Sequence, residues 1–393
     1  MPEQRVPRDV APLLFAAMTI FVLTVVIGIL NGTDLMDIPH GLLMAHVHSG
    51  TLGWITLSIF AAAAWIVGGE RVPRLLRDGS IVVVAFYVAM FWADSQPLRP
   101  VAGTLMLAAI VWFSVWTFAQ RRGRALTVPR LSMLLAMLNL TIGAVLGVIL
   151  GLALAGTIDI GDGIAGAHPA MMVVGYLILA GVALDERVLK GETDQPASRL
   201  GAIQAWLFFG AGIALAIGIL LNVMPLLGLN LLGEIAGVAI VLIRHRREIA
   251  SAGWPAASAR LHAAASLMFT LPALGLLGYL IGRYADDIEA APRELLLALD
   301  HATFIGILTN AIVALLLIAT ASRRDIWAWA DGFVFWAMNL GLIGFVVGLV
   351  AEAATIKRVA TPVMGAGILL GLLTTAMRLR SQDRTEGTAL DAA

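Results

Sequence analysis

The stretch LSMLLAMLNLTIGAVLGVILGLALAG, residues 131–156, contains 26 residues and no charged side chain. Because about 20 apolar residues in a helix cross a bilayer, this stretch predicts a membrane-spanning helix. Apolar stretches of this kind recur along the chain and number twelve, and they cover 11–31, 42–68, 79–97, 101–119, 131–156, 163–184, 200–222, 225–243, 260–282, 295–321, 326–351 and 359–377. Their continuous rather than alternating hydrophobicity predicts an all-α integral membrane protein and excludes a strand barrel.

The composition is that of a chain whose solvent is the lipid bilayer. Of its 393 residues, 60% are hydrophobic and 13% are charged, whereas soluble domains carry about 25% charged residues. An ordinary soluble enzyme is therefore excluded, and so is a disordered chain. The 26 basic and 26 acidic residues balance, so the chain has no electrostatic footprint for a nucleic-acid partner.

The basic residues predict how the twelve helices are oriented. With a cytoplasmic N-terminus, 21 of the 26 Lys and Arg residues fall in cytoplasmic segments and 5 in outer loops. This asymmetry follows the positive-inside rule and predicts that both termini are cytoplasmic, in a bacterial-type inner membrane. One membrane domain is expected over residues 1–380, followed by a disordered polar tail over 381–393.

Four histidines are predicted to lie at one depth in the membrane. His46 and His48 fall on the second helix, His168 on the sixth and His301 on the tenth, each roughly 5–10 residues from the outer end of its helix. A histidine at every fourth helix predicts an internal repeat. The repeat would divide the chain into three pseudo-symmetric four-helix arcs, over about 1–125, 126–250 and 251–380.

Two of the histidine segments also share a weak sequence repeat. The stretches HVHSGTLGW, 46–54, and HPAMMVVGY, 168–176, both have the pattern His-x6-Gly-aromatic. The segment that begins at His301 keeps the histidine and loses the rest of the pattern. The sequence repeat is therefore present in two of the three predicted arcs, and it supports the three-arc interpretation for those two.

The type and spacing of these residues indicate a metal or haem site. A histidine within a membrane is costly and marks a functional site by default. The chain has no cysteine, which excludes thiolate metal sites and covalently attached c-type haem, so imidazole is the natural ligand for iron. His46 and His48 are two residues apart, and a helix directs such side chains about 200° apart. The pair can therefore serve two sites on opposite faces of one helix.

The stretch HVHSGTLGW, 46–54, resembles the HVHSGxLGW motif in the catalytic subunit of C-type (cbb-type) haem–copper oxidases. In that family the first histidine of the motif ligates the high-spin haem and the second ligates the low-spin haem. The superfamily also has twelve core helices in three arcs, with its ligands on the second, sixth and tenth helices. The resemblance therefore implies one or two b-type haems, held by His46, His48, His168 and His301.

The same resemblance implies a class of activity. The expected chemistry is electron transfer, or the binding or reduction of a diatomic gas (O2 or NO). An enzyme of this kind would be an oxidoreductase of the oxidase or nitric oxide reductase type, with a redox partner or a small cytochrome subunit.

The resemblance leaves two ligand assignments open, because the family's His-x-His helix is the tenth and here it is the second. In a direct assignment, His46 or His48 and His301 sandwich a low-spin haem, and His168 lies on the copper-ligand helix. In an assignment rotated by one arc, His48 pairs with His168, His46 holds a second haem, and His301 faces that haem.

The copper site of the family has no counterpart in the sequence. That site needs two adjacent histidines on the following helix, and neither 200–221 nor 326–349 contains a histidine. A second metal, copper or iron, near one haem is therefore an open alternative. Haem binding is the better supported expectation, ahead of oxygen reduction.

Charged residues in unusual places are further candidates. Arg99, Lys357 and Arg358 break the positive-inside rule and could bind haem propionates, with solvated loop charges as the alternative; Arg283 and Arg293 rank behind them. Glu234 lies near the middle of the eighth helix, where a carboxylate is expensive. It is predicted as a proton relay, and the alternative is a hydrogen-bonded helix contact.

The remaining motifs have structural interpretations. The repeat Gly143-x3-Gly147-x3-Gly151 predicts a close-packing helix face. The other three histidines are expected away from the site: His40 and His262 at the membrane interfaces, and His245 in a basic cytoplasmic loop.

A proton-coupled secondary transporter without haem is the alternative function. Twelve helices with internal repeats are common among transporters, and Glu234 could carry the proton. Transporters usually have broken helices and binding charges at the midplane, whereas these histidines are predicted to lie off-centre.

Overall fold

A computed structural model describes residues 6–68, 71–95, 98–192, 194–253, 257–284 and 290–391, with the backbone alone from 383 onward. Within these residues the secondary structure is helical throughout. The elements are η1 (Arg8–Val10), α1 (Ala11–Gly32), α2 (His40–His48), η2 (Ser49–Thr56), α3 (Leu57–Val67), α4 (Arg74–Trp92), α5 (Arg99–Gln120), α6 (Val128–Leu154), α7 (Gly163–Ala170), η3 (Met171–Leu177), α8 (Ile178–Lys190), α9 (Arg199–Leu220), α10 (Met224–Ala250), α11 (Ala259–Tyr284), α12 (Arg293–His301), η5 (Ala302–Thr309), α13 (Asn310–Ala319), η6 (Ala321–Arg323), α14 (Ala328–Val350) and α15 (Ala354–Asp391).

These elements form twelve helical spans in the described residues, each long and apolar enough to cross a membrane. The predicted number of helices is therefore confirmed. The third span is shifted toward the N-terminus relative to its predicted bounds, because α4 covers Arg74–Trp92 rather than 79–97. Pro73 precedes its first turn, and the helix extends past the apolar run into a turn with Arg74 and Arg77, whose long side chains can reach the polar edge of a bilayer.

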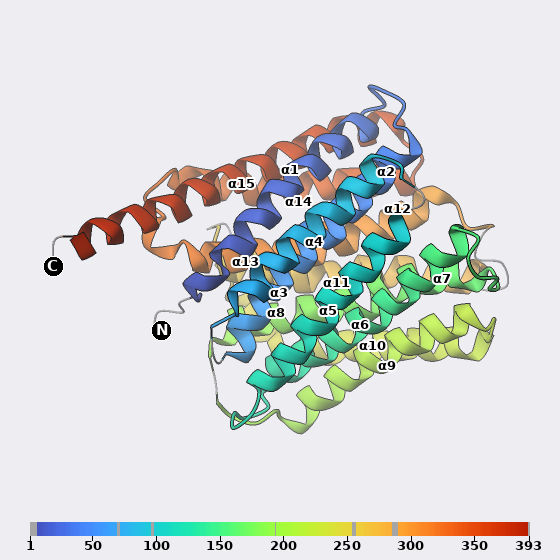
Figure 1. Ribbon diagram of the computed structural model, residues 1–393, viewed down its shortest axis with the longest axis horizontal. Helices are drawn as coiled ribbons and strands as arrows, with labels where there is room; N and C mark the ends of the chain where they lie inside the picture. The colour runs from blue at the N-terminus through green and yellow to red at the C-terminus, as the bar shows by residue number, and fades with distance from the viewer. Residues whose placement is uncertain are drawn as a thin grey trace.

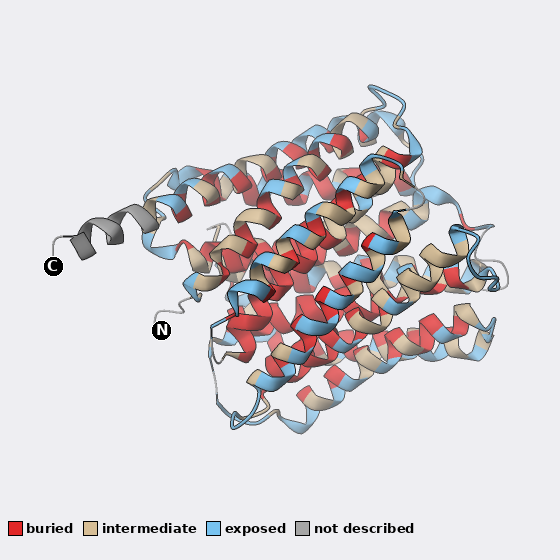
Figure 2. Cartoon of the chain, viewed as in Figure 1, coloured by how far each residue is buried: buried red, intermediate tan, exposed pale blue. Residues whose placement is uncertain are grey.

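Three spans form the centre of the bundle, and the other nine surround them. The spans His40–Val67, Gly163–Lys190 and Arg293–Ala319 have 89%, 72% and 78% of their most apolar window buried, against 28–56% for the other nine. Buried residues accordingly concentrate along the middle of the molecule (Figure 2). In the surrounding layer α1 contacts α4, and the contacts continue through α5, α6, α9, α10 and α11, while α14 packs on α15 and α15 returns to α1.

Each of the three central spans has the same irregularity. An α-helical start is followed by a π-helical segment, namely η2, η3 or η5, and the span then returns to α-helix. Long π-helical segments are rare and occur most often at functional sites. The segment η5 contacts both η2 and η3, and the Trp54 indole Nε1 donates a hydrogen bond of 3.0 Å to Thr309 Oγ1. The π-helical segments therefore pack together in the centre of the bundle.

The chain termini and the starts of the central spans lie at opposite ends of the bundle. Both chain termini lie at the same end (Figure 1), here called the terminal end, and the three central spans all begin at the opposite end. The predicted polar tail covers residues 381–393. The structure describes the backbone of α15 as far as Asp391 and the side chains of this tail only at residues 381 and 382.

Candidate functional site

The four predicted histidines line one cavity, here called the histidine cavity. It lies toward the end opposite the termini. The centres of water-sized molecules can occupy about 270 Å³ of it. His46, His48, His168 and His301 enter it from the three central spans. Its remaining wall is mainly apolar and comes from both the central spans and the surrounding helices, which contribute Phe21, Leu107, Ile110, Val148 and Phe345 among others.

All four imidazoles are held in the same chemical way. In each ring Nδ1 lies within hydrogen-bond distance of a backbone carbonyl: 2.8 Å from His46 to Thr24, 2.8 Å from His48 to Met44, 2.9 Å from His168 to Gly143 and 2.8 Å from His301 to Leu297. A carbonyl can only accept, so Nδ1 carries the hydrogen and Nε2 keeps its lone pair. No hydrogen bond from a described residue reaches any of these Nε2 atoms. Metal-binding histidines have this arrangement, because the outer hydrogen bond fixes the tautomer and the ring.

His46 and His168 are anchored to a neighbouring helix by the same local pattern. His46 donates to the Thr24 carbonyl of α1, and its ring lies over Gly28, where an added Cβ would be 3.0 Å from the imidazole Cε1. The carbonyl and the glycine are four residues apart, so they lie on the same face of α1. The glycine thus provides the space that the imidazole occupies.

His168 repeats this pattern on α6. It donates to the Gly143 carbonyl, and its ring lies over Gly147, where an added Cβ would be 2.8 Å from Cε1. The predicted close-packing face is therefore present at Gly143 and Gly147, where it receives His168 and Met172. Gly151 has no neighbour within 4 Å of an added Cβ, so the third glycine of the motif does not take part.

His48 and His301 are anchored within their own helices and packed against aromatic rings. Each donates to the carbonyl four residues earlier. The His48 ring stacks on Phe91 with centroids 3.9 Å apart and planes at 14°, and it meets the edge of Tyr87 at 5.4 Å. The His301 ring lies 4.7 Å from the Phe345 ring.

The four imidazoles reach one cavity from three spans, and His46 and His48 are directed about 200° apart on α2. Among the described residues, no three His, Asp or Glu side chains gather closely enough to hold a bare metal ion. The cavity therefore does not match a site in which three of these side chains hold a single bare ion.

The predicted propionate-binding residues lie near the cavity but do not line it. Lys357 and Arg358 donate to Asp34 at 3.0 and 2.9 Å, and these hydrogen bonds hold the pKa of Asp34 below its usual value. Arg99 pairs with Asp94 and lies 4.7 Å from the centroid of the Phe91 ring. All three cations thus have protein partners.

Two other ionisable residues do line the histidine cavity. Arg293, one of the weaker basic candidates in the sequence, is exposed and contributes to the wall. Asp300 precedes His301 and also lines the cavity. Both residues belong to α12, whose first turn begins at Arg293.

Glu234 lies apart from the histidine cavity. It is 1% exposed and lines a separate small space with Thr270 and Thr303, among apolar residues. Its Oε1 has no hydrogen-bond partner in the described part of the chain. The alternative of a fully hydrogen-bonded helix contact is therefore not met, and the proton-relay role stays a prediction.

Two histidines expected outside the site are buried. His245 belongs to α10, is fully buried and lies 3.3 Å from the Glu186 carboxylate. His262 in α11 is also fully buried, with Nδ1 2.9 Å from Asn310 Oδ1. The loop prediction was wrong for His245, because α10 continues to Ala250, and the interface position of His262 stays a prediction. His40 does begin α2 as an exposed residue.

Comparison with known proteins adds no assignment: no protein-family model matches the chain, and no curated protein matches it.

Proposed function

We propose that the histidine cavity binds one or two b-type haems, in a membrane protein that resembles the catalytic subunit of haem–copper oxidases. The observation that carries this proposal is the common state of the four imidazoles, with Nδ1 bonded to a carbonyl and Nε2 facing an apolar cavity. Haem iron binds an imidazole nitrogen that carries a free lone pair. Bound haem would supply electron transfer or an iron position for a diatomic gas, O2 or NO.

The rotated assignment is the one that the local motif HVHSGTLGW, 46–54, favours, whereas the order of the helices favours the direct one. In the rotated assignment His48 and His168 would hold one haem, while His46 would hold a second haem that His301 faces. The direct assignment leaves His168 to a second metal, for which the described residues offer no set of three ligands.

The residues of the cavity suit the other parts of a haem as well. The apolar wall would cover the porphyrin face and exclude water, and the aromatic rings of Phe91 and Phe345 hold His48 and His301 in place. Arg293 in the wall is the best placed cation for a propionate. Arg99, whose Nη2 donates to Asp94, is the next candidate.

The three-arc fold and its orientation belong to the same proposal. A π-interrupted central span recurs at every fourth helix, and the His46 and His168 contacts repeat in the same register. These repeats support three arcs. The excess of Lys and Arg at the terminal end supports cytoplasmic termini in a bacterial-type inner membrane, with access for a redox partner or a small cytochrome subunit from the other side.

The test is an absorption spectrum of the detergent-purified protein after expression with ample haem. We expect a Soret band and α bands in the reduced state. His48→Ala should remove one haem signal, and His40→Ala, which replaces an exposed histidine outside the cavity, is the control. A colourless protein would refute haem binding and favour the transporter, and equal losses in both variants would indicate a general folding defect.

Carbon monoxide separates the two histidine pairs. We expect CO to bind the reduced protein at the haem held by His46, and CO binding should be lost in His46→Ala but kept in His48→Ala. The opposite result would contradict the rotated assignment and leave the haem proposal itself intact.

A further inference from the structure

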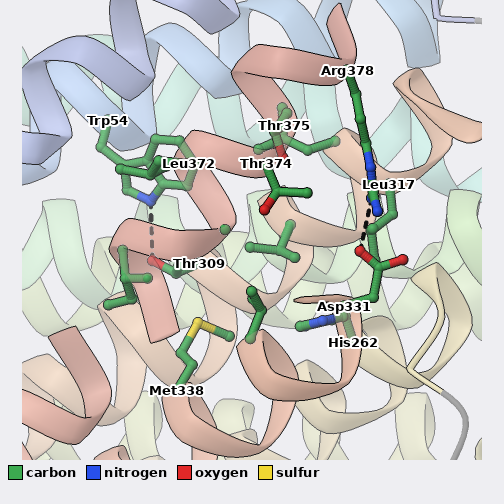
Figure 3. A pocket seen from close by; sticks show the side chains of 15 residues that line it. Trp54, His262, Thr309, Leu317, Asp331, Met338, Leu372, Thr374, Thr375 and Arg378 are labelled. Carbon is green, nitrogen blue, oxygen red and sulfur yellow. Dashed lines mark hydrogen bonds and ion pairs between the residues drawn. The ribbon is translucent and has the colours of Figure 1, made fainter. Parts of the chain in front are cut away.

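A second, smaller cavity is lined by Trp54, His262, Thr309, Asp331, Thr374 and Arg378, among others (Figure 3). It has about 20 Å³ open to the centres of water molecules, and roughly 10–15 Å³ is enough for one water. Trp54 and Thr309 line both cavities. They therefore form the wall between the two spaces, joined by the Trp54 Nε1–Thr309 Oγ1 hydrogen bond.

Two buried polar atoms face this small cavity without a partner. His262 Nε2 and Thr374 Oγ1 are inaccessible and make no hydrogen bond within the described chain, and their residues are 0% and 2% exposed. Nearly all buried polar groups in proteins are hydrogen-bonded, to protein or to ordered water. Two such atoms in one enclosed space of this size indicate a bound water.

The hydrogen bonds of Asn310 show what His262 Nε2 requires. Asn310 Nδ2 donates to the Gly306 carbonyl at 2.9 Å and to Asn339 Oδ1 at 2.8 Å, so its Oδ1 is the acceptor. His262 Nδ1, 2.9 Å from that oxygen, must therefore be the donor. His262 Nε2 is therefore a hydrogen-bond acceptor without a donor, and a water or the Thr374 hydroxyl can donate to it.

The far wall of the small cavity carries a buried ion pair. Arg378 Nη1 donates to Asp331 Oδ1 at 2.7 Å, and the two side chains are 1% and 6% exposed. Arg324 donates to the other Asp331 oxygen at 2.8 Å. Figure 3 shows this pair beside His262, with Thr374 between it and the Trp54–Thr309 contact. A fixed charge pair in a low-dielectric space favours a polar occupant.

We infer that the small cavity is a water-binding site. The water accepts from or donates to Thr374 Oγ1, donates to His262 Nε2, and lies between the Asp331–Arg378 pair and the wall formed by Thr309. This inference does not depend on haem, because the site is made entirely of protein atoms.

Hydrogen–deuterium exchange at a single thiol tests the inference without any cofactor. The chain contains no cysteine, so Thr374→Cys introduces the only S–H stretch in the infrared spectrum. Ser58→Cys is the matched control, since Ser58 is 0% exposed, its hydroxyl is unpartnered, and it lines neither cavity. After transfer to D2O, the Thr374→Cys thiol should exchange at least about tenfold faster, because it meets a resident water and the control must await local opening.

The inference is overturned if the two thiols exchange at the same rate. Thr375→Cys, which lines the same cavity, replaces Thr374→Cys if that variant does not fold. A high-resolution electron cryomicroscopy map gives a second measurement: density between His262 Nε2 and Thr374 Oγ1 is expected, and an empty cavity in a map that shows other buried waters would refute the site.

Discussion

The histidine cavity holds its imidazoles by two different means. His46 and His168 donate to carbonyls of neighbouring helices and lie over glycines. His48 and His301 donate within their own helices and pack against aromatic rings. In the rotated assignment each proposed pair contains one histidine of each kind. Ring orientation therefore depends on helix–helix packing for His46 and His168, and on local aromatic contacts for His48 and His301.

Removal of a ligand should have the largest effect. His168→Ala is expected to abolish the haem signal shared with His48 while leaving CO binding at His46, since each pair is proposed to hold its own haem. The measurement is the reduced spectrum with and without CO. Simultaneous loss of both signals would show that the two pairs do not act separately.

Filling the glycine space should have the next largest effect. In Gly147→Ala the new Cβ would lie 2.8 Å from the His168 ring, so the ring must move, at a cost of about 1–3 kcal/mol typical of overpacking. Gly151→Ala on the same helix has no neighbour within 4 Å and serves as the control. Thermal unfolding followed by tryptophan fluorescence should show a lower Tm for Gly147→Ala alone.

Gly28→Ala refines this comparison. Its Cβ would lie 3.0 Å from the His46 ring, a looser contact than at Gly147, so a smaller loss of stability is expected. If Gly28→Ala were more damaging than Gly147→Ala, the two helix contacts would not be equivalent.

Removal of an aromatic neighbour should have a moderate effect. Phe91→Leu removes the ring stacked on His48, and stacked pairs contribute about 0.5–1.5 kcal/mol beyond their buried area. The variant should keep haem but broaden its absorption bands, because the imidazole gains freedom to rotate. Phe118→Leu, which replaces an exposed aromatic residue away from the cavity, should leave the bands unchanged.

The smallest effect concerns the ion pairs beside the cavity. Lys357 and Arg358 lower the pKa of Asp34 in the folded protein. The ionised carboxylate therefore stabilises the fold at any pH above its pKa in the unfolded chain, which is about 3.9. This stabilisation is lost as the pH falls through the lower pKa of the folded state. Asp34 is well exposed, which limits the contribution to about 0–1 kcal/mol. The Tm difference between the wild type and Asp34→Asn should therefore vanish on acidification, and a difference that grew would contradict the sign.

The sequence predicted the helices better than the side-chain partners. Helix positions follow from continuous apolar runs, because a bilayer requires every backbone group to be bonded within its own helix. The polar partners follow from contacts between distant segments. Asp34 and Lys357 are 323 residues apart, and no local pattern indicates that this carboxylate engages the cation expected for a propionate.

The sequence by itself determined the twelve spans and a histidine at one depth on every fourth helix, since length, hydropathy and helical rise are local properties. Only the tertiary structure shows that the four histidines line one cavity. It also decided that His262 and His245 are buried and that the central spans pass through π-helical segments. These features depend on how the central spans pack against one another and against the surrounding helices, and a single sequence does not encode that packing in any local pattern.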